Sequence, residues 1–508
     1  MVFKGNIEYL TENEIGIRLR ATQQNPSVLP AESLYAIEHD TMDTTFRSMY
    51  QGLYIYLSAR KERRDLLLSQ RPPRFDESLD SMISRSEDDF TRIALKAKAA
   101  QDYFLLIGPP GTGKTSCALK KMVETFHADK DAQILLLSYT NRAVDEICKS
   151  LASIAPAVDF IRVGSELSCD EAYRGHLIEN ELSSCNRRSE VYERIRNCRI
   201  IVGTVAAISG KPELFRLKHF DVAIVDEATQ ILEPQLLGIL CARGEDGKDA
   251  IDKFVLIGDH KQLPAVVQQN TEQSAIYDES LLSIGLANLK DSLFERLYRN
   301  CTATVHRSYD MLCRQGRMHP EVALFANRAF YGGRLIPVGL PHQIESSDTI
   351  CRLAFYPSVP EKAGASAKIN YSEARIVADL AARIYEDHQT DFDESRTLGI
   401  ITPYRSQIAL IKKEIESLGI PALNRILVDT VERFQGSERD VIIYSFCVNY
   451  PYQLKFLSNL TEEEGVLIDR KLNVALTRAR KQMFITGVPE LLERNPLYKS
   501  LLKLIESF

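Results

Sequence analysis

The sequence predicts an α/β protein with two parallel β-sheets in series, each covered by helices on both faces. Short apolar runs alternate with helical segments from about residue 86, in the order YFLLIG, QILLLSYT, CRIIVGT, HFDVAIVDE and KFVLIGD. The alternation restarts after about residue 305 with TLGIITPY, NRILVDTV, RDVIIYSFCV and QMFITGV. A chain of 508 residues is also too long for a single hydrophobic core.

The segment in front of these two units has a different pattern. Residues 1–39 contain alternating stretches such as GNIEYL and IGIRLRAT, which predict a partial β-barrel element. In residues 40–85 the apolar positions first recur at helical spacing, and the proline-containing stretch QRPPRFDES then interrupts that pattern. We therefore expect a helical stalk and a linker there. The first sheet domain is expected over residues 86–300 and the second over residues 301–508.

Composition excludes several classes of protein. The chain is 44% hydrophobic and 26% charged, as in ordinary globular proteins. No apolar run is long enough to span a membrane, and the first 20 residues lack the apolar core of a signal peptide. The ten cysteines include no CxxC pair, so neither a zinc ribbon nor an iron–sulfur cluster is expected, and we predict a cytoplasmic, reducing location. A net charge of −6 leaves room for a local basic groove.

The segment GPPGTGKT (108–115) fits the phosphate-binding pattern G-x-x-x-x-G-K-[ST] between a strand and a helix. Its glycines let backbone N–H groups surround phosphate oxygens at a helix N-terminus. Lys114 is expected to reach the β- and γ-phosphates of ATP, and the Thr115 hydroxyl to bind Mg²⁺. The expected nucleotide-binding residues are Gly108, Pro109, Pro110, Gly111, Thr112, Gly113, Lys114, Thr115 and Ser116.

Two further strand ends supply the rest of a hydrolytic site. VAIVDEATQ places Asp226 and Glu227 directly after an apolar strand, where ligands bind in open α/β sheets. Asp226 is the expected Mg²⁺ ligand, and Glu227 the expected proton acceptor for the attacking water. The alternative is an acidic pair that complements a helix dipole. Gln262, in GDHKQLPA, is expected to sense the γ-phosphate or to position water.

Nine segments in order resemble the motifs of superfamily I helicases. They are GPPGTGKT, SYTNRAVDEI, VGTVAAI, VDEATQ, GDHKQLPA, RQGRMHP, ITPYRSQ, VDTVERFQGSERDVII and LNVALTRAR. The branch that they resemble contains the Upf-like helicases and the helicase half of the DNA-replication nuclease–helicases. The resemblance runs from about residue 85 to the end and implies two tandem RecA-like P-loop domains that hold ATP between them.

The resemblance also implies roles for residues of the second domain. Arg317, in RQGRMHP, and Arg478, in VALTRAR, are expected to contact the γ-phosphate across the cleft, which makes hydrolysis depend on domain closure. Glu438 and the neighbouring Gly436 are expected to reach the ribose or to link the nucleotide to the second domain. Lys114, Glu227, Gln262, Arg317 and Arg478 form the expected catalytic set.

Single-stranded nucleic acid is expected to cross the tops of both domains, held largely by its phosphates. Such contacts predict binding that is independent of base and sensitive to salt. Ordinary loop packing is the alternative for Tyr404 and Thr430. The expected contact residues are Thr140, Asn141, Gly203, Thr204, Pro403, Tyr404, Arg405, Thr430 and Arg433.

The sequence departs from the family pattern where the base is read. Phe90 stands near the position of a glutamine that reads adenine in many relatives, Gln101 lies too close to the strand, and Gly316 replaces a stacking tyrosine. We therefore expect loose nucleotide selectivity, with ATP preferred.

The short front segment suggests a fragment or a truncated relative, with upstream domains or partner proteins outside this chain. No nuclease activity is predicted, because residues 1–85 contain neither the clustered carboxylates with lysine nor the cysteines that it requires.

These features predict an ATP-driven translocase and helicase on single-stranded DNA in replication or repair. By analogy with the branch, we expect 5′→3′ polarity, a monomer and no membrane partner. An Upf-like RNA helicase is the first alternative, since no residue distinguishes the two sugars. A catalytically idle nucleic-acid clamp is the second, and the intact catalytic set argues against it.

Overall fold

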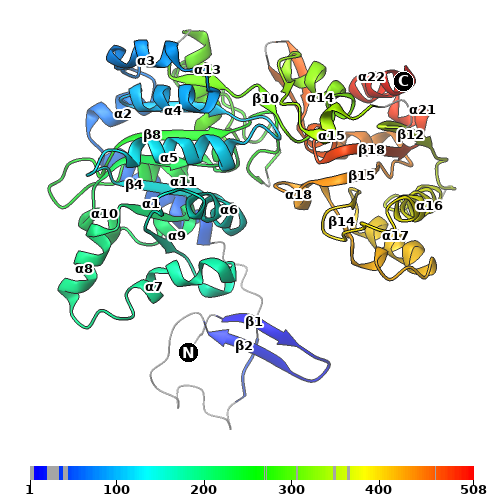
Figure 1. Cartoon of the computed structure of the whole chain (residues 1–508), viewed down its shortest axis with the longest axis horizontal. Coiled ribbons are helices and arrows are strands. Elements are labelled where there is room, and N and C mark those ends of the chain that lie inside the picture. The colour runs from blue at the N-terminus through cyan, green and yellow to red at the C-terminus, as the bar shows by residue number, and fades with distance from the viewer. Residues whose placement is uncertain are drawn as a thin grey trace.

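The computed structural model contains two parallel sheets, each between layers of helices, and so has the tandem RecA-like α/β architecture that the sequence predicts (Figure 1). It describes residues 5–19, 34–37, 44–267, 269–270, 272–304, 307–346, 350–362, 366–463 and 465–507. The expected partial β-barrel falls partly outside these residues. What is described of it is an antiparallel hairpin of β1 (Gly5–Leu10) and β2 (Ile15–Leu19).

The first sheet has seven parallel strands in the order β5-β6-β4-β7-β8-β3-β9. The strands are β3 (Tyr103–Ile107), β4 (Ile134–Ser138), β5 (Phe160–Val163), β6 (Ile200–Thr204), β7 (Phe220–Val225), β8 (Ile251–Gly258) and β9 (Tyr309–Met311). Because all seven run in one direction, the loops that follow them lie along one edge, and this edge collects the predicted motifs.

Alternation along these strands produces a core on each face of the sheet. Leu105 and Ile107 belong to the apolar cluster on one face, and Phe104 and Leu106 to the cluster on the other. All four side chains are buried, which explains why the strand reads as a continuous apolar run. Helices close both faces, including α4 (Asp89–Ala99), α5 (Lys120–His127), α6 (Asn141–Ala152), α9 (Val205–Ser209), α11 (Glu233–Leu240) and α13 (Leu293–Ala303).

The second sheet has five parallel strands in the order β12-β18-β15-β13-β14. They are β12 (Leu353–Pro357), β13 (Leu398–Ile401), β14 (Leu427–Asp429), β15 (Arg439–Ser445) and β18 (Ala479–Gly487). The surrounding helices include α14 (Pro320–Tyr331), α16 (Tyr371–Asp387), α17 (Arg405–Ser417), α18 (Val431–Phe434), α19 (Leu454–Leu457), α20 (Arg470–Leu476) and α22 (Pro496–Ile505). A hairpin of β16 (Leu460–Glu463) and β17 (Val466–Asp469) precedes α20.

The boundary between the sheets differs from the expected position between residues 300 and 301. β9 follows that boundary, yet it pairs in parallel with β3 and therefore extends the first sheet. Sequence periodicity missed it because the strand has three half-buried residues, YDM, and no apolar run. The chain then forms β10 (Arg314–Gln315), which pairs with β11 (Ile336–Pro337). The RQGRMHP loop therefore begins where the chain leaves the first sheet.

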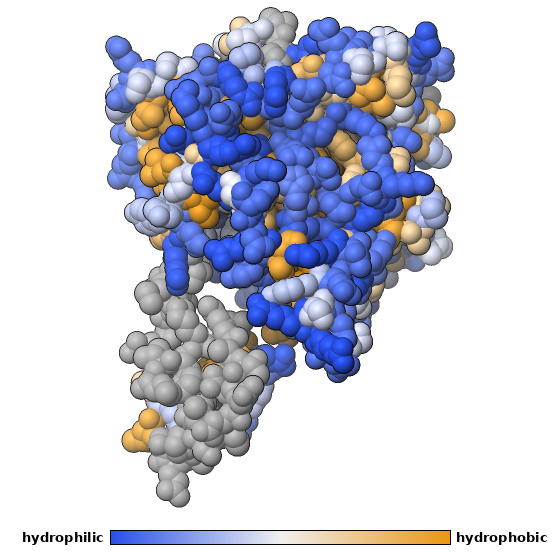
Figure 2. Space-filling model, turned by 90° about the vertical axis from the view of Figure 1, so that its left-hand side faces the viewer, coloured by the Kyte–Doolittle hydropathy of each residue, from blue (hydrophilic) through white to orange (hydrophobic). Residues whose placement is uncertain are grey.

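The expected helical stalk contains α1 (Thr44–Ser58), α2 (Lys61–Leu67) and α3 (Asp80–Arg85). α1 packs closely on α11, since a Cβ added to Gly238 would lie 2.9 Å from the Cα of Gly52. Within the described part of the chain, no helix is both long and apolar enough to cross a bilayer. The face shown in Figure 2 is mainly hydrophilic where it is described, with apolar side chains in separate groups.

Candidate active site

A cavity of about 870 Å³ opens at the carboxyl ends of β3 and β7 and is closed on its other side by loops from residue 314 onward. Of the expected nucleotide-binding residues, all except Gly108 line it; Gly108 lies beneath Lys114, whose Cβ would be 2.7 Å from a Cβ added to the glycine. Thr140, expected at the nucleic acid, also lines this cavity. The catalytic set lines it completely: Lys114, Glu227, Gln262, Arg317 and Arg478.

The phosphate-binding loop owes its shape to two glycines. Gly111 and Gly113 both have φ of +74°, a left-handed conformation that side chains rarely adopt. A Cβ at Gly111 would lie 2.4 Å from the Cβ of Arg317, so the loop also needs glycine for a close approach. The backbone N–H of Gly316 donates to the carbonyl of Gly111 at 2.8 Å. The RQGRMHP loop is thus bound directly to the phosphate-binding loop.

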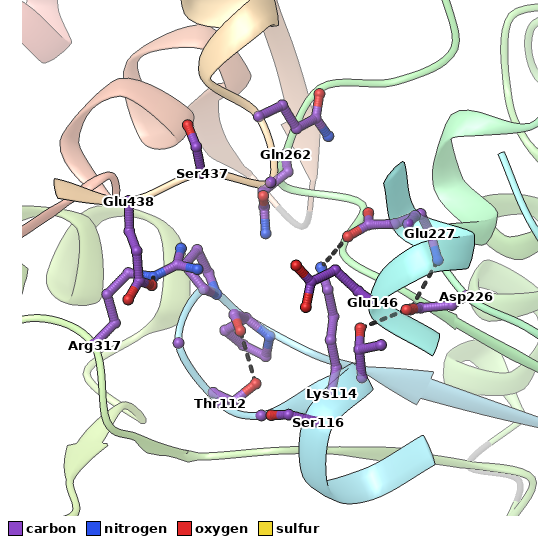
Figure 3. A pocket seen from close by; sticks show the side chains of 18 of the residues that line it. Thr112, Lys114, Ser116, Glu146, Asp226, Glu227, Gln262, Arg317, Ser437 and Glu438 are labelled. Atoms are coloured by element: carbon purple, nitrogen blue, oxygen red, sulfur yellow. Dashed lines mark hydrogen bonds and ion pairs between the residues drawn. The ribbon is translucent and has the colours of Figure 1, made fainter. Parts of the chain in front are cut away.

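Lys114 lies between acidic groups on the first sheet. Its Nζ is 2.8 Å from Glu227 Oε1, and both side chains are largely buried (Figure 3). Burial acts to lower the pKa of Lys114, but the carboxylates of Glu227 and Asp226 outweigh it and hold the pKa above its ordinary value. Burial acts to raise the pKa of Glu227, yet Lys114 lowers it overall, so the carboxylate stays ionised and able to accept a proton.

Asp226 lies beside Thr115, in the first turn of the helix that follows the phosphate-binding loop. The Thr115 hydroxyl donates to Asp226 Oδ2, and the Glu227 N–H donates to Asp226 Oδ1 at 2.9 Å. Burial, followed by the neighbouring Glu227 charge, raises the pKa of Asp226 to about 6. Glu227 has a φ of +54°, which is uncommon for a residue with a side chain, and its carboxylate pairs with Lys114.

Two arginines face this acidic side from the other side of the cavity. Arg317 pairs with Glu438 at 2.5 Å (Figure 3). It also donates to the carbonyl of Thr477. Burial acts to raise the pKa of Glu438, but Arg317 lowers it overall. Arg478 is only 2% exposed and donates to Val474 O, Ser437 O and Gln262 Oε1. Burial, followed by the Arg317 charge, lowers the pKa of Arg478 to about 9.

Arg478 has no ion-pair partner among the described residues, all of its acceptors being neutral oxygens. A buried guanidinium without a counter-charge destabilises the folded protein, and an anion in the cavity would offset that cost. The oxygen donors of Thr115 and Asp226 lie together and are of the kind that Mg²⁺ prefers. The residues present therefore fit a nucleoside triphosphate with its magnesium ion.

Sequence reasoning missed several residues that line the cavity. Glu146 lies on α6 one and a half turns after its start, and only the helical spacing from Asn141 could have indicated it. Gln230 donates to Glu227 at 2.8 Å and orients that carboxylate. Arg142 reaches across the cavity to the carbonyl of Gly436 at 3.4 Å. The other unanticipated lining residues are Cys117, Ala143, Arg314, Val338, Glu432, Gln435, Ser437 and Arg439.

The expected nucleic-acid residues lie at strand ends in both sheets. β4 and β6 are parallel neighbours. Thr204 is the last residue of β6, and Thr140 lies just beyond the end of β4. Each hydroxyl accepts a backbone N–H at a helix start, from Ala143 and Ala207. Asn141 and Gly203 adjoin these two residues. The structure thus brings one set of expected contacts together on the first sheet, beside the cavity described above.

On the second sheet, β13 and β14 are also parallel neighbours. Pro403, Tyr404 and Arg405 follow β13, and Thr430 and Arg433 follow β14. Arg433 is exposed and lies 3.9 Å from Asp429, while Tyr404 accepts a hydrogen bond from Gln453 at 3.2 Å. The two sets therefore occupy equivalent edges of the two sheets.

Comparisons with known proteins agree with this architecture. Two family models described as AAA domain match, one over residues 85–191 and 178–270, the other over residues 289–490. The DNA replication ATP-dependent helicase/nuclease of Homo sapiens is 29% identical over 540 residues, covering 94% of this chain and 46% of the relative. That of Gallus gallus is 29% identical over 502 residues, covering 94% and 45%. The chain spans less than half the length of these relatives.

Other relatives have different lengths. The DNA polymerase alpha-associated DNA helicase A of Saccharomyces cerevisiae is 24% identical over 536 residues, covering 90% of this chain and 73% of the relative. Among solved structures, the arterivirus nonstructural protein 10 helicase with DNA has a TM-score of 0.41 and 15% identity, covering 80% of this chain and 65% of that one. From its family models and relatives, the chain belongs to the superfamily I helicases, a family of ATP-dependent helicases, in the Upf-like branch that contains the DNA-replication nuclease–helicases.

Proposed function

We propose that this protein is an ATP-driven motor that moves 5′→3′ along single-stranded DNA as a monomer. One observation carries the proposal: Lys114, Glu227 and Asp226 on one sheet face Arg317 and Arg478 from the second unit across one cavity. The matched relatives named above are DNA helicases, which supports DNA as the track. The two units meet at this cavity, and we place the boundary between them after β9.

The proposed role of each residue follows from the chemistry of its side chain. Lys114 and the backbone N–H groups of the loop would bind the phosphates, and Glu227 would accept the proton of the attacking water. Thr115 and Asp226 would hold Mg²⁺, which supplies charge neutralisation at the phosphates. Arg317 and Arg478 would stabilise charge that develops at the γ-phosphate. Because these arginines lie outside the first sheet, hydrolysis would depend on closure of the cavity.

Movement would follow from alternate grip by the two sheets. The loops after β4 and β6 would hold one stretch of the strand, and those after β13 and β14 the next. Closure of the cavity around ATP would shorten the distance between the two strand-holding edges, and hydrolysis would allow the cavity to open again. A grip on phosphates predicts little base preference and strong dependence on salt.

Steady-state ATP hydrolysis tests the proposal, with no nucleic acid, with single-stranded DNA and with single-stranded RNA, each at low and moderate salt. We expect DNA to raise kcat, and Glu227→Gln to lower it by about 10²- to 10⁴-fold. Glu279→Gln, at an exposed glutamate, is the matched control. Greater stimulation by RNA would favour an RNA motor. No hydrolysis that depends on Glu227 would contradict the motor and favour a clamp.

A further inference from the structure

The loop after β15 exposes a group of aromatic rings on the second sheet. Tyr452 is 54% exposed and Phe456 is 69% exposed. The rings of Tyr450 and Tyr452 are stacked, with centroids 5.8 Å apart and 14° between their planes. The rings of Tyr452 and Phe456 meet edge to face at 6.5 Å. Exposure of such large apolar surfaces side by side is unfavourable in water, so the group is suited to binding a flat apolar ligand.

A buried amide fixes the loop that carries these rings. Gln453 is 2% exposed, and its Oε1 accepts the backbone N–H groups of Asn449 and Tyr450, both at 2.9 Å. Its Nε2 donates to the carbonyl of Ala367 at 2.7 Å and to the hydroxyl of Tyr404 at 3.2 Å. The rings are therefore held in place before any ligand arrives, which lowers the entropic cost of binding.

The same amide joins the rings to the proposed strand-binding edge. β13 and β15 are parallel neighbours, so the loops after them leave the sheet on the same side. Tyr404 and Arg405 come from the first loop, and Tyr452 and Phe456 from the second. This continuity rests on the function proposed above, in which the loop after β13 holds phosphates.

Exposed cations adjoin the aromatic loop and the two segments that Gln453 contacts. Arg405 follows Tyr404, Lys368 follows Ala367, and Lys455 lies one residue before Phe456. All three are exposed, and none takes part in an ion pair among the residues that the structure describes. Aromatic rings interleaved with free cations form the usual surface for single-stranded nucleic acid, whose bases stack while its phosphates are neutralised. A purely apolar protein partner would not need these charges.

We infer that Tyr452 and Phe456 form a base-stacking platform for the strand, next to the phosphate contacts of Tyr404 and Arg405. A stacked base is held by its π-face, which every base has, so the platform binds without reading sequence. It would also give the second sheet a contact that does not depend on salt.

Binding to two oligonucleotides of about 12 nucleotides tests this inference, one of thymidines and one with abasic sites at the same phosphates. Fluorescence anisotropy measures Kd for the full chain and for Tyr452→Ala/Phe456→Ala. We expect the double variant to bind the thymidine strand about 10-fold more weakly or worse, and the abasic strand as the wild type does. Tyr277→Ala, at a ring that is 80% exposed elsewhere, is the matched control, and melting temperatures test folding.

The outcomes separate the platform from the motor. An equal loss on both strands would assign the rings to a phosphate or folding role and overturn the inference. Unchanged thymidine binding would leave the rings to another occupant, such as a protein, and would also overturn it. If the wild type binds neither strand, the proposed function fails first. A salt dependence that is unchanged in the variant would support stacking, since the phosphate contacts are intact.

Discussion

Glu463 lies 3.0 Å from Nε2 of His260, although the two residues are 203 positions apart. Glu463 is on the β16–β17 hairpin and also lies 3.7 Å from Nζ of Lys261. His260 and Lys261 belong to the loop of Gln262, whose amide contacts Asp259 and Arg478. Burial acts to raise the pKa of Glu463, but the bond to His260 and nearby cations lower it overall. The hairpin thus holds the Gln262 loop with a charged contact.

Glu463→Gln should weaken this hold and misplace Gln262. We expect the nucleic-acid-stimulated kcat to fall by roughly 3- to 10-fold, with KM for ATP little changed, because about 1 kcal/mol of charge-assisted bonding is lost. Glu462→Gln, at the exposed neighbour on the same strand, is the control. Equal behaviour of the two variants in steady-state kinetics would show that the contact does not support catalysis.

Arg478→Gln should lower activity and leave stability unchanged or higher. The folded protein disfavours this buried charge, as its lowered pKa of about 9 indicates, and the charge is fully present at pH 7. If Arg478 contacts the γ-phosphate as proposed, kcat should fall by about 10³-fold or more, the loss typical of arginines that contact a transferred phosphate. Thermal unfolding and ATP turnover of the same preparation measure both effects, with exposed Arg328→Gln as control.

Arg317→Gln should behave differently in the unfolding experiment. It pairs with Glu438 at 2.5 Å, so its removal leaves that carboxylate with only the more distant Arg480, at 3.7 Å, as a counter-charge. We expect a similar loss of kcat but a lower Tm than for Arg478→Gln. If both variants unfold alike, the difference in their ion pairing has no energetic consequence.

Nucleotide selectivity should be loose. Phe90 and Gly316 line the cavity, and the ring of Phe90 would lie 3.6 Å from a Cβ added to Gly113. A phenyl ring offers no hydrogen bond to a base edge, and rejection of a wrong base by apolar contacts alone is weak. We expect kcat/KM for GTP to be within roughly 10-fold of that for ATP. Phe90→Gln should increase the preference for ATP; strict ATP use by the wild type would show that another residue reads adenine.

Stability should depend on pH through Glu373, on α16. Its carboxylate is buried and accepts bonds from Ser445 Oγ at 2.6 Å and the Cys447 N–H at 2.8 Å. Burial raises its pKa to about 7 from an ordinary 4.5. Because the folded pKa is the higher one, ionisation destabilises the fold: the penalty is absent below pH 4.5, grows between 4.5 and about 7, and is complete above.

Glu373→Gln should therefore raise Tm at pH 8 and have little effect at pH 4.5. The gain in the free energy of unfolding is at most about 3 kcal/mol, and less if the amide N–H₂ group lacks an acceptor. Thermal unfolding at both values of pH measures it. Glu386→Gln, exposed on the same helix, should change neither Tm. A gain at low pH alone would reverse the sign of this linkage and contradict it.

The sequence by itself determined the two-sheet class and most of the residues of the candidate nucleotide site. Apolar runs such as YFLLI read as strands because buried parallel strands must be apolar on both faces. The loop GPPGTGKT, Asp226, Glu227 and Gln262 follow such strands, and parallel strands bring their carboxyl ends to one edge. Those residues could therefore be predicted to meet without any coordinates.

Only the tertiary structure decided contacts between segments far apart in the chain. β9 became part of the first sheet because it pairs with β3, although its three residues have no periodic signal. Glu463 reached His260, and Gln453 reached Tyr404, through loops whose paths depend on packing of both units. Local patterns fix the period and direction of an element, but the partner of a buried polar side chain is set by which loops the packed cores bring together.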